Sequence, residues 1–409
     1  MKQRVVIIGH GYTSRLGIAR ALGREGYEVY LLVITRFAHG GKLNTSMPID
    51  GYSKFVDRVL FCPSDEGSLI HLLLSECADS KQKVVIIPDS DFSSAVVDQN
   101  SDLLNQYFVF PNIDHKQGSI VAWMDKIRQK ELAESISINV AKGWKVDVID
   151  GHIDLPDDIQ YPCFPKPRAT LVGGKNGLRR CDNESDLKDV LTFISKRNPN
   201  ISILVEEFKE IDYEHALLGI SDGSNVNIPG IITTTSLASG GHYGVAKCGV
   251  ISPITGFEDI VDEFKSFVLK TGFVGIFDID FFQSRGKYYF CEMNFRYGGS
   301  GYAYTKMGTN LPHQLVRVLL GEELPNDLPN ILRAEAFVNE RMCRADWCEG
   351  YISTLSFLRL IHRDCIKFID DEEDPMPQVV FLRGLWNVRS NFKRIVKRFS
   401  RWFRLVPRS

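Results

Sequence analysis

The chain has 409 residues, of which 44% are hydrophobic and 24% charged, and its net charge is −2 at pH 7. This length is too great for one simple hydrophobic core and predicts two or three domains. The near-neutral charge gives no overall basis for nucleic-acid binding, and no apolar run of 18 or more residues predicts a transmembrane helix.

The amino-terminal residues predict a β-α-β unit. An apolar strand over Arg4 to Ile8 is followed by a helix from about Ser14 to Glu25 and a second apolar strand over Tyr27 to Ile34. This alternation predicts a parallel sheet. The first apolar run is too short for a signal peptide and leads directly into the predicted domain.

Three glycines near the first strand imitate a dinucleotide-binding fingerprint. The third, Gly17, falls six residues after the second, Gly11, and no clear acid closes the second strand. Because this spacing departs from G-x-G-x-x-G, an NAD-dependent oxidoreductase is only a distant alternative.

A further buried strand is predicted over Lys83 to Pro88, and two acids, Asp89 and Asp91, follow it. Open α/β sheets place their ligands at the carboxyl ends of the strands, where these acids lie. Solvated loop acids are an equally good interpretation.

Several basic and glycine-rich positions follow in the middle of the chain. Lys126 opens a helical stretch, where lysines are usually solvated. Lys166 stands between two prolines in an apolar strand, and burial disfavours its ammonium unless an anion pairs with it. The segment Gly173 to Gly177 could turn backbone N–H groups towards phosphate oxygens or form an Asn-Gly turn between two strands.

The segment Phe273 to Gly301 predicts a β-hairpin with a polar turn over Gln283 to Lys287. A three-residue loop centred on Gly286 would place Asp280 directly across from Glu292. Two opposed carboxylates repel each other unless a cation lies between them.

Alternation along the strands puts Asp278 beside Asp280 on this face, and Asn294 and Arg296 beside Glu292. Carboxylate and amide oxygens suit Mg²⁺. The alternative is a solvated polar face, which a two-residue Arg285-Gly286 turn would favour by sending the two acids to opposite faces.

The carboxyl terminus is strongly basic. Residues 383–409 contain nine Lys or Arg and no acid, with apolar residues at helical spacing. A basic helix with Phe and Trp along one face suits an anionic membrane surface. The alternative is a helix docked on the protein's own core or on a partner subunit.

Asp280 and the run Glu292-Met293-Asn294-Phe295-Arg296 resemble the metal-binding end of the ATP-grasp ligases. The resemblance implies that Asp280, Glu292 and Asn294 hold Mg²⁺, or Mn²⁺, on the ATP phosphates. It places Arg296 beside the transferring phosphoryl group.

The same resemblance extends to positions outside the hairpin. It implies that ATP phosphates and nucleoside contact Lys126, Lys166, Gly173, Gly174, Lys175, Glu206, Glu207, Phe208 and Glu214. It also implies that Lys247 points to the reacting phosphate or carboxylate.

The implied fold is α/β and α+β. A Rossmann-like domain over residues 1–115 would precede an ATP-grasp core over 116–325, in which two α+β subdomains grip ATP and the small lid spans about 150–207. An extension over 326–382 and a basic amphipathic tail over 383–409 would follow. The run Gly9 to Gly23 resembles carbamoyl-phosphate synthetase large-subunit halves and D-aspartate ligases.

The implied activity is ATP-dependent ligation of a carboxylate and an amine through an acyl phosphate, with release of ADP and phosphate. The substrates would be small molecules, or a lipid-linked cell-envelope precursor if the tail lies on a membrane. A phosphotransferase or a nucleotide-binding scaffold at the membrane are the alternatives. Nine cysteines without a C-x-x-C pair predict reduced thiols and a cytoplasmic protein. If the basic tail binds a membrane, that surface would be the inner face of the cytoplasmic membrane. No nucleic-acid partner is expected, and a homodimer is left open.

Overall fold

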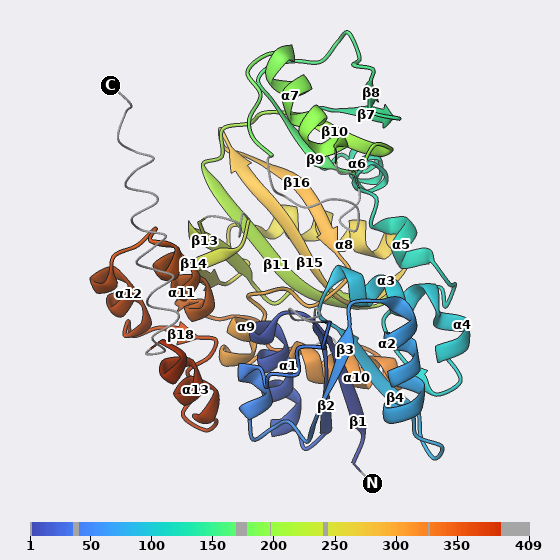
Figure 1. Cartoon of the computed structure of the whole chain (residues 1–409), viewed down its shortest axis with the longest axis vertical. Helices are drawn as coiled ribbons and strands as arrows, with labels where there is room; N and C mark the ends of the chain where they lie inside the picture. Colours follow the sequence, from blue (N-terminus) through green and yellow to red (C-terminus); the bar gives the residue numbers. More distant parts are fainter. Residues whose placement is uncertain are drawn as a thin grey trace.

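The computed structural model of the chain, drawn in Figure 1, describes residues 2–35, 41–168, 178–196, 198–239, 244–325 and 328–385. Three sheets organise these residues. The predicted phosphate-loop residues Gly173, Gly174 and Lys175 lie outside the described residues, as does the predicted tail from residue 386 onwards.

The amino-terminal part is a five-stranded parallel sheet in the order β3-β2-β1-β4-β5, which confirms the predicted β-α-β unit and parallel sheet. Strands β1 and β4 are apolar along almost their whole length because helices cover both faces of such a sheet. The elements of this part are β1 (Arg4–Gly9), α1 (Tyr12–Arg24), β2 (Glu28–Thr35), the 3₁₀ turn η1 (Ile49–Tyr52), β3 (Arg58–Pro63), α2 (Glu66–Leu72), the π-helical turn η2 (Leu73–Cys77), β4 (Val84–Pro88), α3 (Asp91–Gln99), α4 (Ser101–Leu104) and β5 (Phe108–Val109).

A small antiparallel sheet in the order β8-β7-β10-β9 lies at the top of Figure 1. Strand β7 alternates exposed and buried residues, and its buried Trp144 and Val146 pack with Leu187 and Leu191 of the covering helix α7. The elements leading to and forming this sheet are α5 (Ser119–Trp123), α6 (Lys126–Ser135), β7 (Gly143–Ile149), β8 (His152–Ile153), β9 (Cys163–Pro167), α7 (Glu184–Ser195) and β10 (Ile201–Glu207).

The third sheet has nine strands and forms the centre of the molecule (Figure 1). Its main path is β16-β15-β11-β13-β14-β17-β18, with β12 paired to β11 and β6 paired to β15. The strands and adjoining helices are β6 (Asn112–Ile113), β11 (Tyr213–Asp222), β12 (Val226–Asn227), β13 (Ile231–Leu237), β14 (Ala246–Ser252), α8 (Glu258–Thr271), β15 (Phe273–Ser284), β16 (Lys287–Asn294), α9 (Tyr302–Lys306) and α10 (Leu311–Leu319).

Helices cover both faces of the nine-stranded sheet. On one face, Phe264 and Phe267 of α8 pack with Phe277 and Phe281 of β15. On the other, α9 and α10 belong to a core that also includes residues of β1 and β2, so they join the large sheet to the parallel sheet. The two sheets therefore share one continuous apolar cluster.

The carboxyl-terminal part completes the large sheet. Strand β17 (Glu335–Val338) pairs with β14, and β18 (Ile366–Lys367) pairs with β17. The predicted limit at residue 325 thus falls before two strands that extend the central sheet. The helices α11 (Glu340–Glu349), α12 (Thr354–Ile361) and α13 (Met376–Leu385) pack together around Trp347, Phe357 and Phe381.

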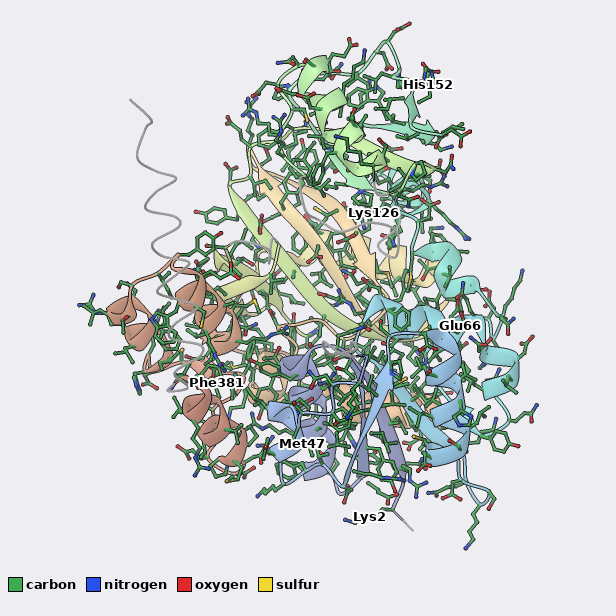
Figure 2. All side chains as sticks on the ribbon, viewed as in Figure 1. Lys2, Met47, Glu66, Lys126, His152 and Phe381 are labelled. Carbon is green, nitrogen blue, oxygen red and sulfur yellow. The ribbon has the colours of Figure 1, made fainter. Side chains whose placement is uncertain are left out.

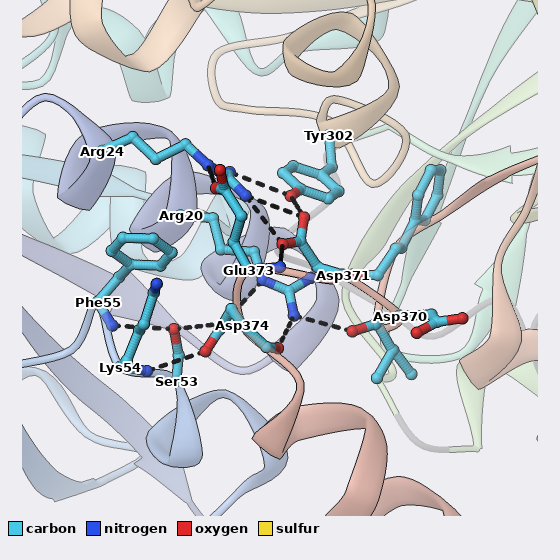
Figure 3. A network of polar contacts seen from close by, with 12 residues as sticks. Arg20, Arg24, Ser53, Lys54, Phe55, Tyr302, Asp370, Asp371, Glu373 and Asp374 are labelled. Atoms are coloured by element: carbon cyan, nitrogen blue, oxygen red, sulfur yellow. Dashed lines mark hydrogen bonds and ion pairs between the residues drawn. The ribbon is translucent and has the colours of Figure 1, made fainter.

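Buried ion pairs fasten this carboxyl-terminal part to α1 (Figure 3). The Arg20 guanidinium donates to Asp374 Oδ2 at 2.9 Å and to the carbonyl oxygens of Phe368, Ile369 and Asp374. Arg24 donates to Asp371 Oδ1 at 2.9 Å. These contacts hold residues 366–374 against the amino-terminal helix. Breaking one of the pairs would be costly, because it would leave a buried charge without its partner.

Among the described helices, none is both long and apolar enough to cross a bilayer. The predicted membrane-binding tail begins within the last turn of α13, at Arg383, and otherwise lies outside the described residues.

Candidate active site

The hairpin formed by β15 and β16 brings Asp280 opposite Glu292, as predicted, but by a different route. Ser284 pairs with Lys287, so the turn is the two-residue Arg285-Gly286 and the predicted three-residue loop is wrong. Both turn residues have positive φ, 49° and 74°, as a type I′ turn requires.

A β-bulge restores the alignment that the short turn would have lost. The register shifts between the pairs Phe281–Phe290 and Asp280–Glu292, so Cys291 is the extra residue in β16. The phenylalanine pair stays in the core under α8, while the two acids come together. The amide of Phe290 donates to Asn139 O at 2.9 Å, which holds the strand at the bulge.

One face of the large sheet collects most of the predicted polar residues. Asp278 pairs with Asn294 and Asp280 with Glu292, and Asn294 Nδ2 donates to Asp280 Oδ2 at 3.3 Å. Opposed residues of an antiparallel ladder point to the same side, as do residues two apart along a strand. These four side chains therefore lie on one face.

Glu214 of β11 extends this face. It lies two residues before Ala216, which pairs with Asp280. Its neighbour His215 points the other way and stacks on Phe281 at 5.0 Å between ring centroids. A hollow of about 300 Å³ is lined by residues 211–214 of the β11 side and by Thr234 to Leu237 of β13, so Glu214 forms part of its wall.

Lys126 reaches the acids from the other side. Its Nζ forms an ion pair with Glu292 Oε2. Helix α6 begins at this lysine because the Asp125 side chain caps it, accepting from the amide of Ile127 at 2.9 Å. The same carboxylate pairs with Arg168, which follows β9. Figure 2 shows Lys126 below the small sheet, next to the central strands.

Lys166 and Glu206 face each other across β9 and β10. Lys166 Nζ lies 2.5 Å from Glu206 Oε2, and Lys130 Nζ lies 2.5 Å from the other carboxylate oxygen. Burial alone would raise the pKa of Glu206, but the two lysines outweigh it and lower that pKa to about 2. Burial would likewise lower the pKa of Lys166, yet Glu206 and the nearby Glu292 raise it. Both side chains are therefore charged at neutral pH.

The end of β10 holds the other predicted nucleoside contacts. Glu207 Oε1 accepts from the amide of Lys142 at 2.9 Å and pairs with Lys209. The amide of Phe208 donates to Pro162 O at 2.8 Å, and the Arg180 guanidinium lies 4.8 Å from the centre of the Phe208 ring. These residues lie at the exit from the small sheet towards β11.

Arg296 joins the large sheet to the parallel sheet. Its guanidinium donates to Asp278 Oδ2 at 3.2 Å and to Asp91 Oδ1 at 3.1 Å. Burial opposes its charge, but the surrounding acids raise its pKa. Burial also raises the pKa of Asp278 to about 6, against the attraction of Arg296. Asp91 begins α3, so the edge of the parallel sheet contacts the predicted phosphoryl-transfer residue.

Lys247 lies apart from these contacts. Its Nζ is 2.6 Å from Asp346 Oδ2, and the other oxygen of Asp346 accepts from the amide of Ser239 at 2.8 Å. Both side chains of the ion pair are buried. Among the described residues, the side-chain ion pair of Lys247 is with Asp346 and not with the acids of β15 and β16. The catalytic role of Lys247 stays a prediction.

Sequence patterns did not reveal most of the residues that form ion pairs with the predicted site residues. Lys130 lies four residues after Lys126, so helical spacing could have placed both lysines on one face of α6. Asp346 lies 99 residues from Lys247 and Asp91 lies 205 from Arg296, and no local pattern links either pair.

The donor set suits a hard cation. Asp280 and Glu292 are opposed carboxylates, with the Asn294 amide beside them. Among the described residues, no three His, Cys, Asp or Glu side chains are grouped to bind a metal, so a metal here would rely on two carboxylates plus the amide. Oxygen-only ligation of this kind fits Mg²⁺ or Mn²⁺ better than Zn²⁺.

Part of the chain is similar in sequence to a known protein family. Residues 125–327 match the family described as carbamoyl-phosphate synthase L chain, ATP binding domain. The carbamoyl phosphate synthase large chain of Gemmatimonas aurantiaca is 23% identical over 210 residues, which are 50% of this chain and 19% of that protein. The chain thus spans about a fifth of the length of such relatives.

Comparison with solved structures agrees at the level of the fold. The L-amino acid ligase from Bacillus licheniformis superimposes with a TM-score of 0.60 at 16% identity, covering 82% of this chain and 79% of that one. The biotin carboxylase domain of the 2-oxoglutarate carboxylase from Hydrogenobacter thermophilus, solved with MgADP and bicarbonate, gives 0.61 at 17% identity, covering 82% and 74%.

Proposed function

Because residues 125–327 form an ATP-grasp domain of the carbamoyl-phosphate synthase large-chain type, we propose that this chain is an ATP-dependent ligase joining a carboxylate to an amine. ATP and Mg²⁺ are the cofactors of this kind of domain, and Mn²⁺ would fit the same ligands. The parallel sheet at residues 4–109 would be the Rossmann-like domain that precedes the ATP-grasp core.

The observation that carries the proposal is the direct opposition of Asp280 and Glu292, with Asn294 and Lys126 in contact with them. Asp280, Glu292 and Asn294 would hold the metal ion, which supplies positive charge to the β- and γ-phosphates of ATP. Opposed acids in one ladder pair are otherwise unfavourable. A structural hairpin has no need of them.

The cations around these acids have a common role in the proposal. Lys126, Lys166 and Arg296 would stabilise the negative charge of the transferring phosphoryl group. A substrate carboxylate oxygen would form a bond to the γ-phosphorus and release ADP. The amine would then attack the acyl carbon, form the amide and release phosphate. This chemistry needs no nucleophilic Ser or Cys.

The remaining predicted contacts complete the nucleotide site in this proposal. Glu206, Glu207, Phe208 and Glu214 would hold the nucleoside, and Gly173, Gly174 and Lys175 would close over the phosphates. Lys247 would contact the reacting phosphate or carboxylate, and its ion-pair partner Asp346 would then also belong to the site. The domain limits at residues 115, 325 and 382 belong to the same proposal.

The experiment that tests the proposal is Mg²⁺-dependent release of phosphate from ATP across a matrix of amines, amino acids and carboxylates. Signal that needs both an amine and a carboxylate, and that Glu292→Gln abolishes, would establish a ligase. Signal from a carboxylate or an alcohol alone would indicate a phosphotransferase. ATP binding without turnover of any pair would favour a scaffold.

The basic tail would place the proposed enzyme at a membrane surface. Residues 383–409 carry nine Lys or Arg and no acid, which favours an anionic membrane surface on the cytoplasmic side. A lipid-linked carboxylate or amine would then be a suitable substrate besides small soluble ones. A homodimer is compatible with this arrangement.

A further inference from the structure

Strand β10 carries Glu206 on the face of the small sheet that is turned away from α7. Ile203 and Val205 belong to the apolar cluster that includes α7, so the side chain of Glu206 points to the opposite face. Lys166 of β9 and Lys130 of α6 meet it there. One carboxylate therefore lies between two ammonium groups.

The two lysines differ in what else they contact. The side chain of Lys130 is 7% exposed, and its Nζ also donates to Ala141 O at 2.5 Å. The side chain of Lys166 is 29% exposed. Burial opposes its charge, whereas Glu206 and, more weakly, Glu292 of β16 raise its pKa. Lys130 is thus enclosed, and Lys166 lies towards the acids of the proposed metal site.

The strand opposite Glu206 has a glycine that leaves room for Lys130. Gly143 of β7 pairs with Glu206, and a Cβ added to this glycine would fall 3.3 Å from Lys130 Nζ. Helix α6 is itself fixed to β16, because Gln129 donates to Met293 O at 3.0 Å and accepts from the amide of the same residue at 2.8 Å. The surroundings of Lys130 are therefore built from both the small sheet and the central sheet.

The balance of charge at this face depends on Lys130. Without it, Lys166 and Glu206 would form a neutral ion pair beside the proposed phosphate site. With it, two ammonium groups and one carboxylate leave one net positive charge, and Lys166 is the more exposed of the two cations. Water and salt screen such a charge less in a partly buried site than on an open surface.

We propose that Lys130 is a positioning residue of the nucleotide site: it binds one oxygen of Glu206 and offsets its charge, so that Lys166 meets the ATP phosphates as an uncompensated cation. Lys130 itself touches neither the nucleotide nor the substrates and acts through its two neighbours. This inference rests on the proposed function, since it concerns how the same site binds ATP.

The test compares the binding of ATP with that of adenosine, because only ATP carries the phosphates. Both are titrated into the full chain in the presence of Mg²⁺ and measured by calorimetry. Lys130→Met should weaken ATP by about tenfold and change adenosine by less than about twofold, because the charge at the phosphates alone is lost. Damage to the shape of the site would weaken both probes.

A double variant separates a role in charge from a role in structure. In Lys130→Met combined with Glu206→Gln, the acid and the lysine that offsets it are both gone, so Lys166 regains its net charge. The preference for ATP over adenosine should then return to within about threefold of its native value, since neighbouring charges are not additive. Additive losses would overturn the proposal. If Lys130→Met alone does not fold, a native-like preference in the double variant is still required.

The matched control is Lys188→Met. Lys188 also pairs with an acid at 2.5 Å, Glu184, but it lies on α7 and its side chain is 53% exposed. Helix α7 covers the other face of the small sheet. Loss of this lysine should leave the binding of ATP and of adenosine unchanged.

Unchanged ATP binding by Lys130→Met, or equal loss of ATP and adenosine, would overturn this inference and leave the ligase intact. The expected pattern of ATP binding without turnover of any amine and carboxylate would retain the role of Lys130 and reject the ligase. Absence of ATP binding by the native chain would reject both.

Discussion

Asp280 lies opposite Glu292 because Cys291 bulges out of β16 after a two-residue turn. Without the bulge, the same turn would have set Asp280 opposite Cys291 and sent Glu292 to the other face of the sheet. The alignment of the two acids is therefore built into the strand itself, and it permits the most direct test of the site.

Glu292→Gln keeps the shape of the side chain but removes its charge. We expect turnover to fall by about 100-fold or more, since a ligand of the proposed metal and the partner of Lys126 are lost together. Steady-state phosphate release at saturating ATP measures the change. The matched control is Glu258→Gln in the first turn of α8, and equal activity of both variants would reject the site.

Arg296→Ala should lower turnover to a similar extent, about 100-fold or more. The guanidinium bridges Asp278 and Asp91, so its loss also leaves the buried Asp278 without its cation. We expect Arg296→Lys to recover the fold more fully than the rate, because a lysine cannot contact both acids with one planar group. Melting temperature and turnover measured side by side distinguish the two effects. Full activity in Arg296→Ala would contradict the assignment.

Glu206 should make the protein sensitive to acid. Its pKa is about 2 in the folded chain and near its ordinary value of 4.5 when unfolded, so its charge stabilises the fold above about pH 4.5. That contribution, roughly 3 kcal/mol, is lost as the pH falls from about 5 to 2. Urea unfolding across this range should show a shallower acid limb in Glu206→Gln. This variant should also be less stable at pH 7, because Lys166 and Lys130 lose their shared acid.

Asp89 should give the opposite dependence of stability on pH. Burial raises its pKa to about 7, so the folded chain holds its proton more tightly than the unfolded chain does. Stability from this group is complete below about pH 4 and is lost as the pH rises through 7. Asp89→Asn should therefore stabilise the ligand-free protein at pH 8 by roughly 2–4 kcal/mol and leave it unchanged near pH 4. A destabilised variant at pH 8 would show that the carboxylate has a partner in the fold.

The basic tail can be tested by removal. Truncation after Leu385 should abolish sedimentation with vesicles that contain phosphatidylserine and leave the turnover of soluble substrates within about twofold. The binding of the full chain should weaken as salt is raised, since its attraction is electrostatic. Equal vesicle binding with and without the tail would exclude this role.

Local patterns predicted much of the fold. The apolar runs of β1, β2 and β4 and the turn signals of the β15–β16 hairpin are short-range features, and the structure confirms the parallel sheet and the pairing of Asp280 with Glu292. The turn length was wrong because the bulge depends on contacts made by residues far away in the sequence, including the hydrogen bond from Phe290 to Asn139.

These local patterns could not predict pairing between segments that lie far apart in the sequence. Strand β17 is four residues long and was not predicted, since its reason to form is the edge of β14 almost 90 residues earlier. Asp346, the partner of Lys247, and Asp374, the partner of Arg20, share this property. Each is an ordinary charged residue in its own segment, and the fold alone gives it a neighbour.

The pairing of β17 with β14 also bears on how this protein can be divided. A fragment ending at residue 327 would contain the whole matched domain but would leave the backbone of β14 open over Cys248 to Ile251. Open strand edges pair readily with other chains, so such a fragment would tend to self-associate. The smallest unit suited to separate expression should therefore extend through α13.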